Sequence, residues 1–324
     1  MRYLAGRLIE TVFLLIGVSF LTFLFSSLAP GSYLDEMRLN PQISSETLRS
    51  LRAEYQLDQP LPVRYARWAV SLARGELGYS FAYNSPVAPL LWVRARNTLL
   101  LTVTATLIAW ALALPLGVWS AETLGRLPDR ALSLVTALLL AIPDLVLALG
   151  LLILAARSGR LPTGGFVSVN FETLSPFEKL RDLASHMALP VAALVLTTLP
   201  VLLRHVRAAV AEVLDAPFLR AAAAHGIPRR KLLYGYALRA AAHPLISLFG
   251  FSVGTLLSGS LLVEIVMSWP GLGPLLLEAI LARDLYVVIG TVLFSMVFLV
   301  MGNFLADVLL YWADPRIRSE ASVK

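Results

Sequence analysis

The sequence predicts an all-α membrane protein with six transmembrane helices. Hydrophobic residues make up 57% of the 324 positions and charged residues only 15%, whereas a soluble domain carries about a quarter charged residues. The apolar residues also gather in blocks close to the roughly 20 residues that a helix needs to cross a bilayer. Because backbone groups find no hydrogen-bond partner in hydrocarbon, each block is expected to be helical.

The blocks differ in length. The fourth is short, whereas the third and the sixth are long, and kinks at Pro115, Pro143 and Pro200 would absorb the mismatch with the bilayer. In chain order, the blocks are Leu8–Leu28, Thr98–Ala121, Ala131–Ala156, Met187–Leu203, Leu245–Val263 and Leu285–Trp312.

The first block resembles a signal peptide, since Arg2 and Arg7 precede it. Its apolar core exceeds the ~7–15 residues of a signal sequence, so we expect a retained helix. Six crossings place both termini on one side, and the short loops of that side carry most of the arginines and lysines. The positive-inside rule therefore predicts cytoplasmic termini.

This topology divides the chain into four parts. They are an N-terminal transmembrane helix at 1–28, an extracytoplasmic loop subdomain at 29–96, a five-helix core at 97–312 and a cytoplasmic tail at 313–324.

The long outer loop is expected to be structured. The stretch "SSETLRSLRAEY" offers a serine at 44–45 as an N-cap, followed by Leu48, Leu51 and Tyr55 on one helix face. The stretch "VRYARWAVSLARG" predicts a second amphipathic helix that Gly75 ends. Together they predict a small cap on the outer surface.

The composition excludes several kinds of chemistry. The chain has no cysteine, which excludes disulfides, thiolate metal sites and cysteine nucleophiles. No two of the four histidines have the i, i+4 spacing of a helical zinc site, and no phosphate-binding G-x-x-x-x-G-K-[ST] loop occurs. We therefore expect no enzyme activity, metal or cofactor in this chain, and any ATP hydrolysis must occur on another chain.

Asp144, in "LLLAIPDLVLALG", is the most deeply placed ionisable residue. A charge at the centre of a membrane helix costs about 2.5–3.5 kcal/mol, so such residues are candidates for function. One hypothesis is a carboxylate on a transport or proton pathway. The other is a side chain that bonds backbone groups freed by the kink at Pro143. We favour the second, because one carboxylate without a partner is a poor relay.

A basic segment, "FLRAAAAHGIPRRKLLYGYALRAAAHPLIS", lies between two membrane segments. Asp215 is expected to cap a short helix with Pro217 in its first turn, and Gly226 to end that helix in a left-handed conformation. Pro228 would start a second helix, with Leu232, Leu233, Tyr236 and Ala237 on its apolar face. A hairpin lying on the membrane surface is one hypothesis. Docking onto a cytoplasmic protein explains the apolar faces better, and tethering at both ends disfavours a DNA-binding motif.

The sequences "RAAAAHG" and "YALRAAAHP" resemble the EAA loop of ABC-importer permeases, the segment that fits a cleft on the ATPase subunit. Ala221, Ala222 and Gly226 fit the pattern, whereas Arg220 stands where glutamate is usual. The later isoleucine and proline positions hold Tyr236 and Arg239. The resemblance makes 204–243 a coupling loop, with six expected contact residues: Phe218, Leu219, Arg220, Ala221, Ala222 and Gly226.

Other stretches resemble the B-type permease of the peptide/nickel branch of this family, and the likeness covers nearly the whole chain. They are "RLIETVFLLIGVSFLTFLFSSLAPG", "YQLDQPLPVRYARWAVSLARGELGYSFAYNSPV", and the C-terminal signature "LVEIVMSWPGLGPLLLEAILARDLYVVIGTVLF" with "NFLADVLLYWADPRIR". Within the signature, prolines and glycines bar a continuous helix, which predicts a bent outer element near the solute path. Its gate candidates are Trp269, Pro270, Gly271 and Gly273.

The resemblance implies a type I importer permease in the bacterial inner membrane. The expected partners are the lipid bilayer, a homologous second permease, two ATPases that bind ATP and magnesium, and an extracytoplasmic solute-binding protein. No nucleic acid is expected. The expected solutes are di- or oligopeptides, with nickel, glutathione or another small solute as alternatives. A secondary transporter would need paired carboxylates or an inverted repeat, and the sequence shows neither.

Overall fold

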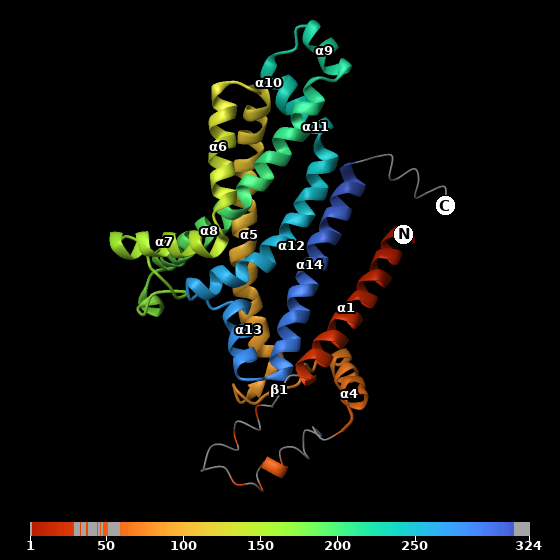
Figure 1. Cartoon of the computed structure of the whole chain (residues 1–324), viewed down its shortest axis with the longest axis vertical. Coiled ribbons are helices and arrows are strands. Elements are labelled where there is room, and N and C mark those ends of the chain that lie inside the picture. The colour runs from red at the N-terminus through yellow and green to blue at the C-terminus, as the bar shows by residue number, and fades with distance from the viewer. Residues whose placement is uncertain are drawn as a thin grey trace. The chain divides into compact units, whose positions relative to one another are not determined.

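The computed structural model describes residues 2–28, 59–313 and a few isolated positions between them (Tyr33, Met37, Ser44, Glu46, Leu48–Ser50). The described chain is largely helical (Figure 1). It forms two compact units, one of residues 1–98 with 270–298 and the other of residues 99–269 with those from 299 onward. Most of the first outer-loop helix expected from "SSETLRSLRAEY", including Leu51 and Tyr55, lies outside the described residues, as does the tail beyond Ala313.

The elements follow one another along the chain with few long connections. They are α1 (Arg2–Leu28), α4 (Leu61–Ala73), β1 (Tyr79–Ser80), β2 (Ser85–Pro86), α5 (Val87–Glu122), α6 (Leu127–Ala141), α7 (Asp144–Ser158), η1 (Phe171–Thr173), α8 (Pro176–Leu214), α9 (Pro217–Ala224), α10 (Arg229–Lys231), η2 (Leu232–Ala237), α11 (Leu238–Ala240), α12 (Ala242–Val266), α13 (Leu272–Leu281) and α14 (Leu285–Ala313).

The membrane-spanning helices agree with the sequence prediction. Among the described residues, α1, α5, α8, α12 and α14 are each long and apolar enough to cross a bilayer. The pair α6 and α7 also qualifies when taken as one broken span, which brings the number to six. The prediction of a polytopic all-α protein is therefore confirmed.

The third predicted segment is not one kinked helix. It breaks into α6 and α7, which meet at 99°, and Figure 1 shows α7 turned away from the line of α6. The backbone of Ile142 is extended, with φ −86° and ψ 123°. A residue before proline is disfavoured in the helical region, and proline lacks an N–H to continue the helix. By contrast, α5 runs through Pro115 and α8 through Pro200.

In the first unit, α4 packs on α1 through aromatic side chains. Trp68 of α4 is buried with Phe23 of α1 and with Ile289 and Leu293 of α14. The Trp68 indole donates a hydrogen bond to the Leu77 carbonyl at 3.2 Å. This helix, the second amphipathic one predicted within 29–96, is thus anchored to its own unit, as an amphipathic pattern predicts.

In the same unit, the β1–β2 hairpin is held by a buried carboxylate. Asp284, between α13 and α14, accepts hydrogen bonds from the Ser80 hydroxyl at 2.6 Å and from the Ala82 amide at 3.2 Å. Asp284 is only 2% exposed. These bonds satisfy a buried carboxylate that would otherwise be costly, and they fix the hairpin against the end of α13.

In the second unit, α8 packs against α6, α7 and α12 around one apolar core. Helix α12 also approaches the end of α14 closely at Gly250, where an added Cβ would lie 2.2 Å from the Cβ of Ala306. One turn later, a Cβ at Gly254 would lie 2.0 Å from Leu299. This G-x-x-x-G spacing lets two membrane helices touch through their backbones.

A valine at Gly250 should therefore push α12 and α14 apart. Overpacking of this kind costs about 1–3 kcal/mol, and we expect a lower thermal unfolding midpoint for the purified Gly250→Val protein in detergent. Gly150→Val is the matched control, because nothing lies within 4 Å of a Cβ added at Gly150. Equal midpoints for the two variants would contradict the close approach of α12 and α14.

Candidate functional site

The short helix α9 lies between α8 and α10 and projects at one end of the second unit (Figure 1). Its N-cap is Ala216, with Pro217 at the first helical position and no side-chain cap. The prediction that Asp215 caps this helix is wrong, because Asp215 instead ends α8. Proline at the first helical position fixes the start of α9 one residue later. The Asp215 carbonyl accepts a hydrogen bond from Arg220 at 3.0 Å.

The C-terminal end of α9 is closed by a Schellman motif. The amide of Gly226 donates to the Ala223 carbonyl at 3.0 Å, and the amide of Ile227 to the Ala222 carbonyl at 3.4 Å. Gly226 has a φ of 79°, in the region that a Cβ disfavours. The left-handed conformation that the sequence predicts at Gly226 is what the structure has, and Pro228 follows directly.

The side chains of α9 face two ways. Leu219 is buried in the core of the second unit, and Ala222 packs against that core. Phe218 is 50% exposed, and Arg220 and Ala221 are also exposed. The apolar face that the sequence assigns to docking is therefore divided: Leu219 and Ala222 hold the helix on its own unit, and Phe218 and Ala221 remain open to a partner.

The second half of the hairpin is not a regular α-helix. Residues Leu232–Ala237 form a π-helical turn between α10 and α11. Leu232, Leu233 and Ala237 are buried as expected, whereas Tyr236 is exposed. The i to i+5 bonding of a π-turn changes the register of the side chains, so the prediction that Tyr236 lies on the apolar face is wrong.

A buried ion pair supports the base of this hairpin. Asp129, at the start of α6, accepts two hydrogen bonds from the Arg207 guanidinium of α8, at 2.6 and 2.9 Å. It also accepts from the Ser120 hydroxyl at 2.6 Å and from the Gly125 amide at 2.8 Å. Asp129 is only 3% exposed, so four hydrogen bonds compensate the burial of its charge.

A second, exposed ion pair lies nearby, between Arg229 of α10 and Glu122 of α5 at 3.0 Å. The two residues at the ends of the α5–α6 connection, Glu122 and Asp129, therefore form ion pairs with α10 and with α8. In the sequence, Arg207 and Arg229 are distinguished only as basic residues of a short loop, which bear on topology. No local pattern reveals the first pair, because 78 positions separate Asp129 from Arg207.

The gate candidates lie where the chain passes from the second unit to the first. In the second unit, Trp269 is fully buried and its ring lies 5.1 Å from that of Phe166. In the first unit, the Pro270 carbonyl accepts from the Asn97 side chain at 2.8 Å. Gly271 precedes α13 in an extended conformation. Gly271 and Gly273 are both buried.

Tyr83, in the loop between β1 and β2, donates a hydrogen bond to the Glu278 carboxylate of α13. Burial, reinforced by this bond, raises the pKa of Tyr83 to about 12. The phenol therefore keeps its proton at physiological pH and remains a donor. The bond adds a second tie between the hairpin and α13.

Asp144 begins α7 directly after the break at Pro143. No hydrogen bond or ion pair joins its carboxylate to another residue in the part of the chain that the structure describes. The interpretation favoured from the sequence, in which Asp144 bonds backbone groups freed by Pro143, is therefore not what the structure shows. The side chain instead lines a cavity with residues of α8 and α12.

Residues 113–319 match the family described as the binding-protein-dependent transport system inner membrane component. The chain belongs to this family. The matched residues include α8, the hairpin that contains α9, and α12. The family is one of membrane transport components rather than enzymes. Over residues 2–28 and 59–313, no group of His, Asp or Glu side chains is arranged to hold a metal ion.

Several relatives resemble the chain over nearly its full length. The oligopeptide transport system permease protein AppB of Bacillus subtilis is 32% identical over 97% of this chain and 98% of its own. The dipeptide transport system permease protein DppB of Escherichia coli is 32% identical over 98% and 99%. The oligopeptide transport system permease protein OppB of Mycobacterium tuberculosis is 31% identical over 98% and 99%.

Among solved structures, a chain of the MetNI methionine ABC transporter in inward-facing conformations has a TM-score of 0.57 to this structure. It is 17% identical and covers 69% of this chain and 96% of that chain. At this identity the comparison concerns the fold alone. The fold is that of an ABC-importer permease, as the sequence predicts.

We expect Asp129→Ala to destabilise the protein. Removing one partner of a buried pair costs up to 3–5 kcal/mol, but Arg207 keeps 29% of its side-chain exposure, so we expect about 1–3 kcal/mol. The measurement is thermal unfolding of the purified chain in detergent. Glu122→Ala, which breaks only the exposed pair, should cost less than about 1 kcal/mol. An Asp129→Ala, Arg207→Ala double-mutant cycle without coupling would contradict the assignment.

Proposed function

We propose that this chain is one permease subunit of an ATP-driven importer for di- or oligopeptides. The chain is 32% identical, over nearly its full length, to permeases named for oligopeptide and dipeptide transport, and this similarity supports the solute class. The transporter would pair this chain with a homologous second permease, two ATPases and an extracytoplasmic solute-binding protein. ATP and magnesium would bind to the ATPases, and both termini of this chain would lie in the bacterial cytoplasm.

The two faces of α9 support the proposed coupling role. Its inner face, through Leu219, fixes the helix on the permease. Its outer face offers an aromatic ring at Phe218, a small side chain at Ala221 and a cation at Arg220. An exposed aromatic residue beside small ones is suited to a partner's groove, and Arg220 would meet an acidic rim on the ATPase.

The outer surface of the first unit provides a platform for the solute-binding protein. A cavity of about 490 Å³ lies between α4, the β1–β2 hairpin and α14, with Arg64, Arg67, Trp68 and Tyr79 in its lining. The Nε of Arg64 is buried without a hydrogen-bond partner. Two arginines beside aromatic rings suit a carboxylate, so we assign this cavity to an acidic side chain of the binding protein.

The segment from Trp269 to Gly273 would form the outer gate. Irregular backbone near membrane depth has to be buried in protein or line a water-filled cavity. In the first unit, the side chains of Asn97 and Thr98 hold the backbone of Pro270 and Leu272, in place of the bonds of a continuous helix. Such a junction can change its bonds without unwinding a membrane helix.

Gly226→Val should uncouple the transporter. Valine strains the left-handed turn that closes α9, since β-branched residues rarely adopt a positive φ, while the membrane helices are unchanged. In proteoliposomes that contain the complete complex, uptake and solute-stimulated ATP hydrolysis should fall together. Gly159→Val is the control, because Gly159 has a φ of 62° at the end of α7. Wild-type coupling in Gly226→Val would refute a coupling role for α9.

Arg67→Glu should weaken the productive contact with the binding protein, because it places a second negative charge where we expect a carboxylate. Binding-protein-stimulated ATP hydrolysis should then require a higher binding-protein concentration, by roughly tenfold for a charge reversal. Arg74→Glu, outside the cavity lining, should leave this concentration unchanged. Equal effects of the two reversals would argue against the cavity as the docking point.

A further inference from the structure

A cavity of about 260 Å³ lies within the second unit between the start of α7 and the helices α8 and α12. Its polar lining consists of Asp144 and four hydroxyl side chains, those of Thr197, Thr198, Ser252 and Thr255. The remaining lining residues are Leu, Val, Phe and Gly, so Asp144 is the one charged group among the described residues of the lining.

Each of these hydroxyl groups already donates its hydrogen bond to a backbone carbonyl of its own helix. Thr197 and Thr198 both donate to the Leu194 carbonyl, at 3.0 and 2.8 Å. Thr255 donates to the Ser252 carbonyl at 3.1 Å, and Ser252 to a carbonyl one turn earlier in α12 at 2.7 Å. A hydroxyl has one proton and two lone pairs, so these oxygens meet an incoming ligand as acceptors.

The Asp144 carboxylate adds more acceptor capacity and a negative charge. It is not engaged by any cation or donor of the described chain. The Ser252 oxygen accepts one hydrogen bond, from the Trp110 indole at 3.0 Å. The indole N–H is therefore not available to donate to a ligand. The side chains that line the cavity thus offer acceptors and a negative charge, and no free side-chain proton.

The chemistry that fits this lining is a primary ammonium group, which carries a positive charge, three donors and no acceptor. We propose that this cavity binds the α-ammonium group of the solute during its passage, with Asp144 as the counter-ion. The proposal rests on the proposed import of peptides. A free peptide amino terminus has this chemistry, whereas its carboxylate end would be repelled by Asp144.

The absence of natural cysteines allows a direct test of the charge in the cavity. In the complete transporter, the Thr198→Cys variant of this chain would have a single cysteine, and it would line the cavity. Thr255→Cys is a separate variant that places the single cysteine at a second position of the same cavity. A cationic methanethiosulfonate reagent should react faster than an anionic one, by roughly tenfold for a nearby charge in a protein environment. Adding Asp144→Asn should remove this preference.

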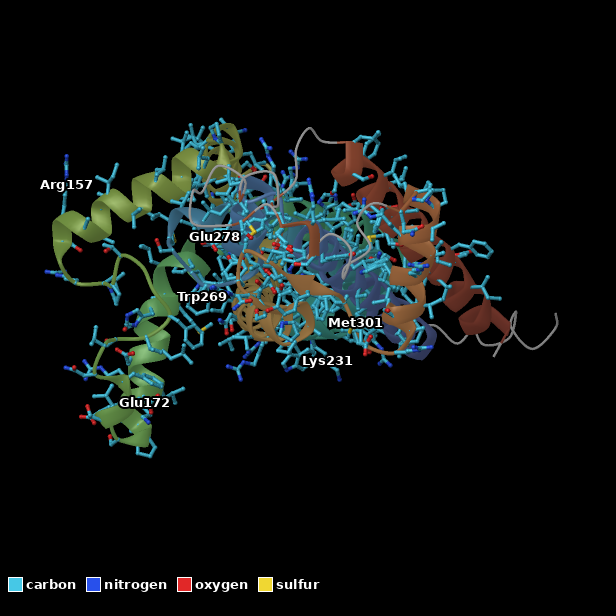
Figure 2. All side chains as sticks on the ribbon, turned by 90° about the horizontal axis from the view of Figure 1, so that it is seen from below. Arg157, Glu172, Lys231, Trp269, Glu278 and Met301 are labelled. Atoms are coloured by element: carbon cyan, nitrogen blue, oxygen red, sulfur yellow. The ribbon has the colours of Figure 1, made fainter. Side chains whose placement is uncertain are left out.

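The matched control is Glu172→Gln. Glu172 lies in the loop that contains η1, where Figure 2 shows it at the periphery, and its side chain is 91% exposed. This substitution neutralises a carboxylate outside the cavity and should leave the reagent preference unchanged. Equal rates for the two reagents at both cysteine positions would overturn the proposal.

A second arm tests the ligand. Millimolar L-alanyl-L-alanine should slow the labelling severalfold, and N-acetyl-alanyl-alanine should not, because acetylation removes the ammonium group. Protection that survives acetylation or Asp144→Asn would overturn the proposal. Protection by sodium chloride but not by choline chloride would assign the cavity to an inorganic cation, which would also overturn it.

The two proposals fail in different ways. If the wild-type complex shows charge preference and protection but takes up no peptide, the proposed peptide import is wrong and the ammonium site stands. If Asp144→Asn takes up alanyl-alanine at the wild-type rate and wild-type labelling is not slowed by this peptide, the site is wrong and peptide import stands.

Discussion

Every backbone group within a membrane has to find its hydrogen-bond partner inside the protein, and this constraint shapes each irregular point of the chain. Where α12 ends and α13 begins, side chains replace the missing helical bonds: Asn97 donates to the Pro270 carbonyl, and the Thr98 hydroxyl accepts from the Leu272 amide. Within the first unit, Asp284 accepts a hydrogen bond from the Ser80 hydroxyl of the β1–β2 hairpin. These irregular segments thus have hydrogen-bond partners within the protein.

The same constraint explains how much of the fold could be predicted. The apolar blocks had to become helices, and a glycine followed by a proline two positions later, at Gly226 and Pro228, already indicates where a helix ends and another begins. The break at Pro143 also has a local cause. The angle of the break, 99° between α6 and α7, has no such local cause, because it depends on how these two helices pack against α8 and α12.

The failed prediction for Asp215 has a local cause, the proline at the first position of α9, but most of what the sequence did not reveal depends on the packing of the chain. The periodicity of α9 places Leu219 on an apolar face but cannot say whether that face meets its own chain or a partner. Tyr236 is exposed because a π-turn shifts the register, and no residue in "LLYGYA" requires that turn. Asp129 and Arg207 are brought together only by the packing of α6 on α8. For the same reason, the sequence could not show that the Asp144 carboxylate has no bonding partner among the described residues.

Helix α8 has a mechanical consequence that its sequence does not suggest. It runs for 39 residues without interruption, from the capping box at Ser175 to Leu214 beside α9, a length of about 58 Å at 1.5 Å per residue. If a helix of this length stays straight, a displacement at one end also moves the other end. Pro190 and Pro200, each lacking an amide proton, are the two points where such a lever can flex. A small shift of α9 would thus tilt the part of α8 that lies between α9 and the proline at which the helix bends.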